Sequence, residues 1–511
     1  MSDAFFRTEI TPPSLPPATE RGVVKWLREN LFAGPFNTIL TLAALFAIYT
    51  LLRGAVPWLA NGVWKANSLQ ECRDIVTASA GEGATGACWA MIRERWHQFI
   101  FGLYPAEAYW RPTFAFGLLC AAIAPLLFAG QKRSLLAILA AVAVYLALCL
   151  PLASAPAMAY VAAVVILAAL TVAALIRPAW MLWFTGLFPG VVFFLLWGGS
   201  IWHPVVVLLG FALVFIAFSV IAARGSLLLA ALVAVAAFLV IFFDPFEPIL
   251  HLLDGALGVF TAGPVTLAPG WRDTLPLLPQ VSGWLDGQLG WGIPAIGSDE
   301  FGGFLLCLVI GVTAIAFSLP LGILLALGRQ TDLPVVKMIC VGFIELVRGV
   351  PLITLLFTAS LLLGYFLPSG TNFDAVLRVI ILVTFFAAAY LAEVIRGGLA
   401  ALPRGQYEAA DALGLDYWRA QRLIILPQAL KISIPAIVST FIGLFKDTTL
   451  VSFVALLDPL RGVTGAVRAD LAWKGIYWEP YIFVGAIFFI FCFGMSRYSM
   501  YLEQKLKTDH R

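Results

Sequence analysis

Ionisable side chains interrupt several of the most apolar stretches in the second half of this sequence. The residues concerned are Glu345, Arg348, Glu393, Lys446 and Asp447, with Thr448 directly after the last of them. A charged group in a membrane-like segment is costly to bury, so it usually lines a polar pathway or pairs with an opposite charge. These residues are therefore candidates either for a solute path or for structural ion pairs.

The spacing within these groups leaves both interpretations open. Glu345 and Arg348 lie three residues apart, on one face of a helix, just before a Gly and a Pro that predict a break. Glu393 has the same spacing to Arg396, so both couples can also be structural ion pairs. The adjacent lysine and aspartate stand in an otherwise apolar run and are open to the same two interpretations.

The composition limits the classes of protein to which this chain can belong. Its 511 residues are 61% hydrophobic and 12% charged, with a mean hydropathy of +0.94. Average soluble proteins are about 45–50% apolar and about 25% charged. A net charge of +3 is too small to indicate a polyanionic partner such as nucleic acid. Four histidines without a Cys/His cluster argue against a metal site. Because the composition is more apolar and less charged than that of soluble proteins, we predict an all-α integral membrane protein.

Twelve apolar runs are long enough for a bilayer span, which needs about 20 residues. They cover about 35–55, 112–130, 134–152, 156–176, 180–197, 203–222, 226–243, 301–328, 350–366, 377–397, 430–456 and 479–503. We therefore predict about twelve transmembrane helices, after a polar segment at 1–34. An N-terminal membrane extension of about seven helices, 35–300, contains two polar segments, 56–111 and 244–300. A C-terminal core of five helices occupies 301–505.

Lysine and arginine predict the orientation, because short loops that carry them face the cytoplasm. With the N-terminus inside, every predicted short inside loop carries at least one, for example at Arg177 and Arg329. Both termini are then cytoplasmic. The two polar segments of the extension lie outside, in the periplasm.

Two of the seven cysteines, Cys72 and Cys88, lie in the first outside segment. In an oxidising compartment such a pair forms a disulfide, which would stabilise this segment as a small folded cap. The alternative is two unrelated thiols. The other five cysteines lie in or beside apolar helices, where cysteine behaves as a small hydrophobic residue.

The longest predicted inside loop, 398–429, has a composition unlike a simple linker. Residues 405–413 have helical composition, and Gly414 can take the left-handed conformation that ends a helix. A second helical segment, 416–425, is predicted to stop before Pro427. We expect two short helices at an angle, with a charged face suited to docking a soluble partner.

This loop resembles the EAA loop of bacterial ABC importer permeases. The residues in register are Glu408, Ala409, Ala410, Gly414, Ile424, Leu426 and Pro427, and Asp411 lies among them. Segments 345–352, 390–398 and 446–450 resemble the polar amino acid permeases of that superfamily. The match covers about 300–505, and the long extension resembles the larger permease of general L-amino acid importers.

The resemblance implies a fold and a set of partners. The last five helices would form a MetI-like permease core in the bacterial inner membrane. Such importers pair two permeases with two cytoplasmic ABC ATPases and a periplasmic amino-acid-binding protein. The resemblance implies that the second permease is a homologous but different chain, so that the two form a heterodimer. The chain has no Gly-x-x-x-x-Gly-Lys-Ser/Thr phosphate loop. We therefore expect a transporter subunit and not an enzyme, with no cofactor of its own and ATP–Mg on the partner ATPase.

The same resemblance suggests roles for the buried charges. A zwitterionic amino acid needs a cation for its carboxylate and an acceptor for its ammonium group. Arg348 or Lys446 could supply the first, and Glu345, Glu393 or Asp447 the second. ATP binding would draw the ATPases and the coupling helices together, so that the spans alternate between inward-open and outward-open states.

Two other functions remain as alternatives. A secondary amino acid transporter driven by an ion gradient also suits twelve spans, but such folds usually show two related halves. An integral-membrane glycosyltransferase would need paired carboxylates or a metal cluster in an outside segment. Asp299 and Glu300 are the only such candidates, and a solvated edge explains them as well.

Overall fold

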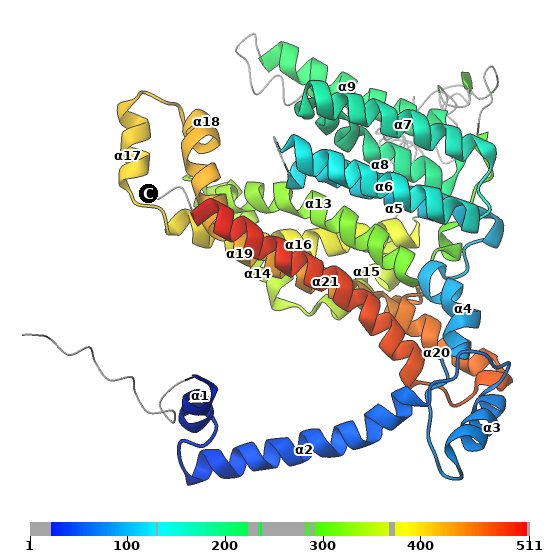
Figure 1. Cartoon of the computed structure of the whole chain (residues 1–511). Coiled ribbons are helices and arrows are strands. Elements are labelled where there is room, and N and C mark those ends of the chain that lie inside the picture. The colour runs from blue at the N-terminus through cyan, green and yellow to red at the C-terminus, as the bar shows by residue number, and fades with distance from the viewer. Residues whose placement is uncertain are drawn as a thin grey trace, which may run out of the picture. The chain divides into compact units, whose positions relative to one another are not determined.

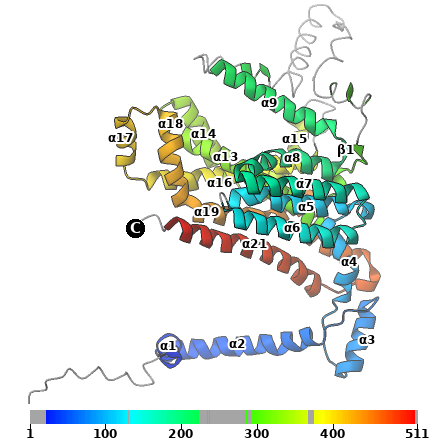
Figure 2. The same cartoon turned by 45° about the horizontal axis from the view of Figure 1, so that its top comes forward.

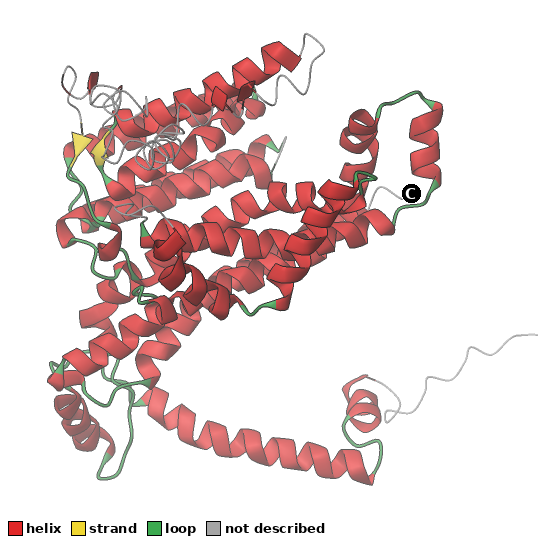
Figure 3. Cartoon of the chain, turned by 180° about the vertical axis from the view of Figure 1, so that it is seen from behind, coloured by secondary structure: helices red, strands yellow, loops and turns green. Residues whose placement is uncertain are grey.

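The structure is a computed structural model that describes residues 22–128, 131–222, 292–366 and 374–507, with isolated positions between 233 and 287. Almost all regular structure in this part of the chain is helical (Figure 3). Two short strands, β1 (Gly199–Ser200) and β2 (Gly292–Ile293), pair antiparallel. The fold is therefore the predicted all-α one.

The described helices fall into two groups along the chain. Before the strand β2 these are α1 (Gly22–Asn30), α2 (Pro35–Ala60), α3 (Leu69–Ala80), α4 (Ala90–Phe101), η2 (Ala106–Ala108), α5 (Trp110–Leu127), α6 (Lys132–Leu152), α7 (Ala157–Ile176), η3 (Pro178–Trp180), α8 (Met181–Trp197) and α9 (Trp202–Ala222). After it come η5 (Ser298–Glu300), α13 (Gly303–Gln330), α14 (Pro334–Gly349), α15 (Leu352–Phe366), α16 (Ala375–Ala400), α17 (Gly405–Ala412), α18 (Tyr417–Ala420), the π-helix η6 (Gln421–Ile425), α19 (Leu426–Asp447), η7 (Thr448–Val454), α20 (Pro459–Ala469), η8 (Leu471–Trp473) and α21 (Trp478–Lys507).

Ten helices among the described residues are long and apolar enough to cross a membrane, and a bent pair brings the number to eleven. The bent pair joins α14 to the start of α15 at 104°. The predicted span 350–366 is thus the second arm of this pair, and the first arm was not predicted as membrane-embedded. The predicted span 226–243 and most of the polar segment 244–300 lie outside the described residues.

The chain divides into two compact units, and the division does not follow the predicted boundary at residue 300. One unit combines 22–96 with 466–483, and the other combines 97–465 with 484–507. Helices α5–α9 of the extension belong to the same unit as the predicted core. The reason is packing, because the apolar faces of α5–α8 share one buried cluster with α13 and α16.

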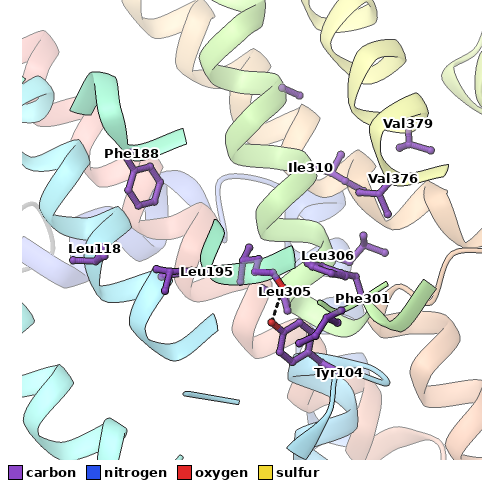
Figure 4. Packing of buried hydrophobic residues seen from close by; sticks show 14 of the residues in the cluster. Tyr104, Leu118, Phe188, Leu195, Phe301, Leu305, Leu306, Ile310, Val376 and Val379 are labelled. Carbon is purple, nitrogen blue, oxygen red and sulfur yellow. Dashed lines mark hydrogen bonds between the residues drawn. The ribbon is translucent and has the colours of Figure 1, made fainter. Parts of the chain in front are cut away.

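That buried cluster joins segments far apart in the sequence (Figure 4). Leu118 and Leu195 contribute from α5 and α8, and Ile310 and Val376 from α13 and α16. Tyr104 lies beside this cluster, and its hydroxyl donates to the carbonyl of Leu196 at 2.7 Å. Burial raises the pKa of the Tyr104 phenol, so it stays a neutral donor.

Helices α13 and α16 approach closely, as membrane helices do where small residues meet. A Cβ atom on Gly322 of α13 would lie 2.8 Å from Cβ of Leu391 and 3.2 Å from the carbonyl oxygen of Ala388 in α16. Only glycine fits at this crossing. In Figure 2, α13, α16 and α19 lie together, and α17 and α18 extend beyond their ends.

The smaller unit contains a cap made by α3, α4 and the segment before α21. Cys72 and Cys88 are joined by a disulfide, with their Cα atoms 5.9 Å apart. The backbone N–H of Cys88 donates to the buried Glu479 carboxylate at 2.8 Å. Two further polar contacts hold the segment before α21, an ion pair between Arg95 and Asp470 and a hydrogen bond between Trp473 and Glu94. The cap is therefore tied to the start of the last span.

Candidate functional site

We call residues 401–425, between the spans α16 and α19, the coupling segment. Its first helix, α17, begins after Pro403 and carries Glu408, Ala409, Ala410 and Asp411. Ala410 is buried, whereas the other three are exposed. One face of α17 therefore packs on the protein, and the other presents two carboxylates to solvent.

The packed face of α17 rests on a buried cluster at the ends of four spans. Leu327 of α13, Ile344 of α14, Ile395 of α16 and Ala429 of α19 belong to this cluster, and Tyr407 of α17 packs against it. Burial raises the pKa of the Tyr407 phenol. Helix α17 thus contacts, through Tyr407, the cluster in which the four helices meet.

Gly414 ends α17 in the way that the sequence predicts. Its φ is +67°, in the left-handed region. Its N–H donates to the carbonyl of Asp411 at 2.9 Å, and the N–H of Leu415 donates to that of Ala410 at 3.2 Å. A Cβ atom at Gly414 would meet nothing within 4 Å in this chain. The constraint on Gly414 thus comes from its backbone conformation and from whatever docks there, not from a neighbour within the chain.

The second half of the coupling segment differs from the prediction. Helix α18 does not stop before Pro427 but continues through the π-helix η6 into α19 (Figure 1). Pro427 lies in the first turn of α19, directly after the π-helix. Ile424 is half-buried and Leu426 is half-buried in this junction. Helix α18 and the π-helix η6 therefore continue into the span α19 without a break in the helical backbone.

Large apolar side chains are exposed on the coupling segment. Leu413 is 73% exposed, Trp418 61% and Leu423 64%. Exposed apolar groups beside carboxylates are typical of a protein-docking surface. The sequence predicts a charged face, and the structure adds these apolar groups to it.

A pair of glutamines was missed in the sequence. Nε2 of Gln428 in α19 donates to Oε1 of Gln406 in α17 at 2.9 Å. It also donates to the carbonyl of Ile424 at 3.1 Å. Neither glutamine belongs to a pattern of period or spacing, so only their position beside the motif could have suggested them.

At the inner ends of the spans lies a group of five charged residues that we call the Glu393 cluster: Arg329, Glu345, Arg348, Glu393 and Arg396. Glu393 accepts from Arg396 at 2.8 Å and from Arg329 at 3.2 Å, and it lies 3.7 Å from Arg348. The predicted Glu393–Arg396 pair is therefore present. Glu393 is occupied by three guanidinium groups.

The predicted pair between Glu345 and Arg348 is absent from the described ion pairs. Arg329 of α13 reaches Glu345 instead, at 3.0 Å. Arg348 turns toward Glu393 and lies over the ring of Tyr390, with its Cζ 5.6 Å from the centroid. Contacts with α13 and α16 thus replace an ion pair between residues one turn apart within α14.

A cavity of about 250 Å³ lies between α16 and α19. Its lining residues are Phe386, Ala387, Tyr390, Thr440, Gly443, Leu444 and Asp447. Asp447 brings a carboxylate to the cavity. Arg348 stacks on Tyr390, and its Nε is buried without a hydrogen-bond partner among the described residues. An acceptor and a cation therefore lie at or beside one cavity.

The structure separates the three neighbouring candidates at the end of α19. Asp447 faces the cavity, but Lys446 is exposed on another face. Thr448 is fully buried, and its hydroxyl donates to the carbonyl of Phe445 at 2.7 Å. Thr448 stays a predicted substrate-path residue, and its buried hydroxyl is bonded within the helix.

Within the described residues, no group of three or more His, Cys, Asp or Glu side chains could hold a metal ion.

Comparisons with known proteins agree on one kind of protein. Residues 318–508 match the family model of the binding-protein-dependent transport system inner membrane component. The chain is 54% identical, over 100% of both chains, to the glutamate/glutamine/aspartate/asparagine transport system permease protein BztC of Rhodobacter capsulatus. It is 31% identical to the inner membrane amino-acid ABC transporter permease protein YhdY of Escherichia coli, over 94% of this chain and 93% of that one. A crystal structure of an amino acid ABC transporter with histidines is 29% identical with a TM-score of 0.35, covering 39% of this chain and 91% of that one.

Proposed function

The chain belongs to the inner-membrane permease subunits of amino-acid ABC importers. On this premise, we propose that its coupling segment drives uptake by passing to the spans the conformational change that ATP causes in a separate ATPase subunit. The observation that carries the proposal is the geometry of that segment. Glu408 and Asp411 are exposed beside the apolar Leu413, while Tyr407 on the same helix packs against the buried cluster that α13, α14, α16 and α19 share. Force applied to α17 would reach the spans directly.

The proposed partners follow from what the chain lacks and from its family. It has no phosphate loop in its sequence, so ATP–Mg would bind two cytoplasmic ABC ATPases. A second homologous permease would complete a heterodimer, and a periplasmic binding protein would deliver the substrate. Both chain termini would be cytoplasmic, as the positions of Lys and Arg indicate.

The proposed substrates are acidic amino acids and their amides. The name of the relative BztC supports this class, since glutamate, glutamine, aspartate and asparagine are the substrates that it states. The cavity beside α16 offers Asp447 as an acceptor for the substrate ammonium group. Arg348, which stacks on Tyr390 at the edge of this cavity, offers a cation for a carboxylate. Glu345 and Glu393 already form ion pairs with arginines, and we assign them to a structural network of charges.

Reconstitution tests the proposal. The chain is co-expressed with the genes that flank it, purified, and placed in proteoliposomes with ATP and labelled glutamate, glutamine, aspartate or asparagine. We expect co-purification of an ATPase and a second permease, and uptake that needs both ATP and the binding protein.

The alternative of an ion-gradient-driven transporter makes the opposite prediction. Uptake by the purified chain alone, driven by a sodium or proton gradient and unaffected by ATP, would contradict the importer mechanism.

A further inference from the structure

A short amphipathic helix precedes the first membrane span. The apolar side chains Val23, Trp26 and Leu27 of α1 are 72%, 56% and 36% exposed. Lys25 and Glu29, one turn apart, form an ion pair at 3.7 Å. At about 100° per residue, the three apolar side chains share one arc of the helix and the charged ones share the opposite arc. The helix therefore has an uncovered apolar face.

Hydrogen bonds define the corner between α1 and α2. Oγ1 of Thr41 in α2 donates to the carbonyl of Leu31 at 2.8 Å, and Oγ1 of Thr38 donates to that of Gly34 at 2.9 Å. Nδ2 of Asn30 donates to the carbonyl of Trp26 at 2.9 Å. Helix α1 thus ends, and the chain turns instead of prolonging the axis of α2 (Figure 1).

The length of α2 sets the depth of that corner. Its 26 residues rise about 39 Å at 1.5 Å per residue, more than the roughly 30 Å of a hydrocarbon core. The first turn of α2 therefore reaches the headgroups, and α1 branches from that level. Tryptophan prefers this same level of a bilayer.

The cations of α1 suit an anionic surface. Glu29 neutralises Lys25, but Arg28 has no acidic partner among the described residues. Arg28 lies on the charged arc and is exposed. A lipid phosphate is the partner that a guanidinium at headgroup level meets most readily.

We propose that α1 is an interfacial anchor that lies on an anionic phospholipid surface. Val23, Trp26 and Leu27 enter the boundary between headgroups and acyl chains, and Arg28 binds lipid phosphate. The anchor holds the inner end of α2 at a fixed depth. This inference does not depend on the substrate or on the coupling mechanism, because it uses only α1 and its corner.

Photocrosslinking tests the proposal in the intact complex. p-Benzoylphenylalanine replaces Trp26 or, as the matched control on the charged arc, Glu29, and the complex is placed in nanodiscs of phosphatidylethanolamine and phosphatidylglycerol. We expect lipid adducts at position 26 about fivefold or more above those at position 29. Adducts at position 26 to another protein chain, or to another segment of this one, would overturn the proposal. Equal lipid adducts at both positions would also overturn it.

A second measurement tests the anionic part and keeps the proposal open to refutation if the photocrosslinker disturbs assembly. Trp26→Cys and Glu29→Cys are labelled with a water-soluble maleimide and read by peptide mass spectrometry. Position 26 should react several-fold more slowly than position 29 in the anionic nanodiscs. Adding Arg28→Glu should reduce the difference in labelling rate between positions 26 and 29 in the anionic nanodiscs. It should not change that difference in phosphatidylcholine nanodiscs. Equal rates without that substitution, or no effect of it, would overturn the proposal.

Discussion

The side-chain amide of Gln428 in α19 donates to the side-chain carbonyl of Gln406 in α17, and this is the described side-chain hydrogen bond that links the first coupling helix to a span. The bond is partly buried, so its loss should cost about 0.5–1.5 kcal/mol. We expect Gln428→Ala to lower the number of substrates carried per ATP several-fold while ATPase binding persists. Uptake and hydrolysis measured together in proteoliposomes give this ratio.

A double-mutant cycle supplies the control for this pair. In Gln406→Ala and in the double variant, the number of substrates carried per ATP should fall no further than in Gln428→Ala alone, because each variant removes the same hydrogen bond. Additive losses would mean that the two glutamines act separately.

Gly414 gives a sharper test of the coupling segment. Gly414→Val should collapse uptake and substrate-stimulated ATP hydrolysis, since a left-handed backbone costs a side chain about 1–2 kcal/mol and a branched one the most. The matched control is Gly414→Asn, because asparagine tolerates this conformation and should keep most of the activity. Membrane insertion should be normal in both. Native ATPase co-purification and stimulation in Gly414→Val would remove the main support for the coupling role.

The Glu393 cluster predicts unequal effects of two similar substitutions. Glu393 contacts three arginines and its side chain is 24% exposed, whereas Glu345 contacts one and is 55% exposed. Glu393→Gln should destabilise the protein by about 1–3 kcal/mol, because it leaves several guanidinium groups uncompensated. This loss is smaller than the loss from breaking a fully buried ion pair, since Glu393 is partly exposed. Glu345→Gln should cost less than about 1 kcal/mol. Thermal denaturation of the purified complex measures both, and equal shifts would contradict the central place of Glu393.

Asp447 is the test of the cavity. Asp447→Asn should reduce uptake about tenfold or more, because the neutral amide cannot form an ion pair with an ammonium group, while ATPase co-purification persists. Lys446→Met, one residue away but outside the cavity lining, should have a much smaller effect. Normal uptake by an assembled Asp447→Asn complex would contradict the assignment of Asp447 to substrate binding. Failure of the complex to assemble would favour a structural role for this residue.

The cap predicts a covalent link that can be read directly. Peptide mass spectrometry without reduction should find Cys72 joined to Cys88, with Cys120 and Cys149 as free thiols in the same sample. The link spans 16 positions, a loop for which a disulfide adds about 3 kcal/mol of local stability. Reduction should therefore expose the cap to proteolysis before the spans. Free thiols at both positions would contradict the expected periplasmic location.

Hydropathy located most spans because a bilayer demands a minimum apolar length, whatever the neighbours are. The predicted runs 301–328 and 377–397 correspond closely to α13 and α16. Helix α14 was missed as a membrane element because Lys337, Glu345 and Arg348 break its apolar run. Its place in the bent pair depends on packing against α13 and α16, which no local window of sequence contains.

The sequence by itself determined the membrane class, the coupling motif and the turn at Gly414, since each depends on residues close together in the chain. Only the tertiary structure decided that Glu345 forms its ion pair with Arg329 and not with Arg348, because Arg329 comes from another helix. It also decided that Asp447, and not Lys446, faces the cavity. Adjacent residues on a helix point about 100° apart, and which direction meets a cavity is known only when the neighbouring helix is in place.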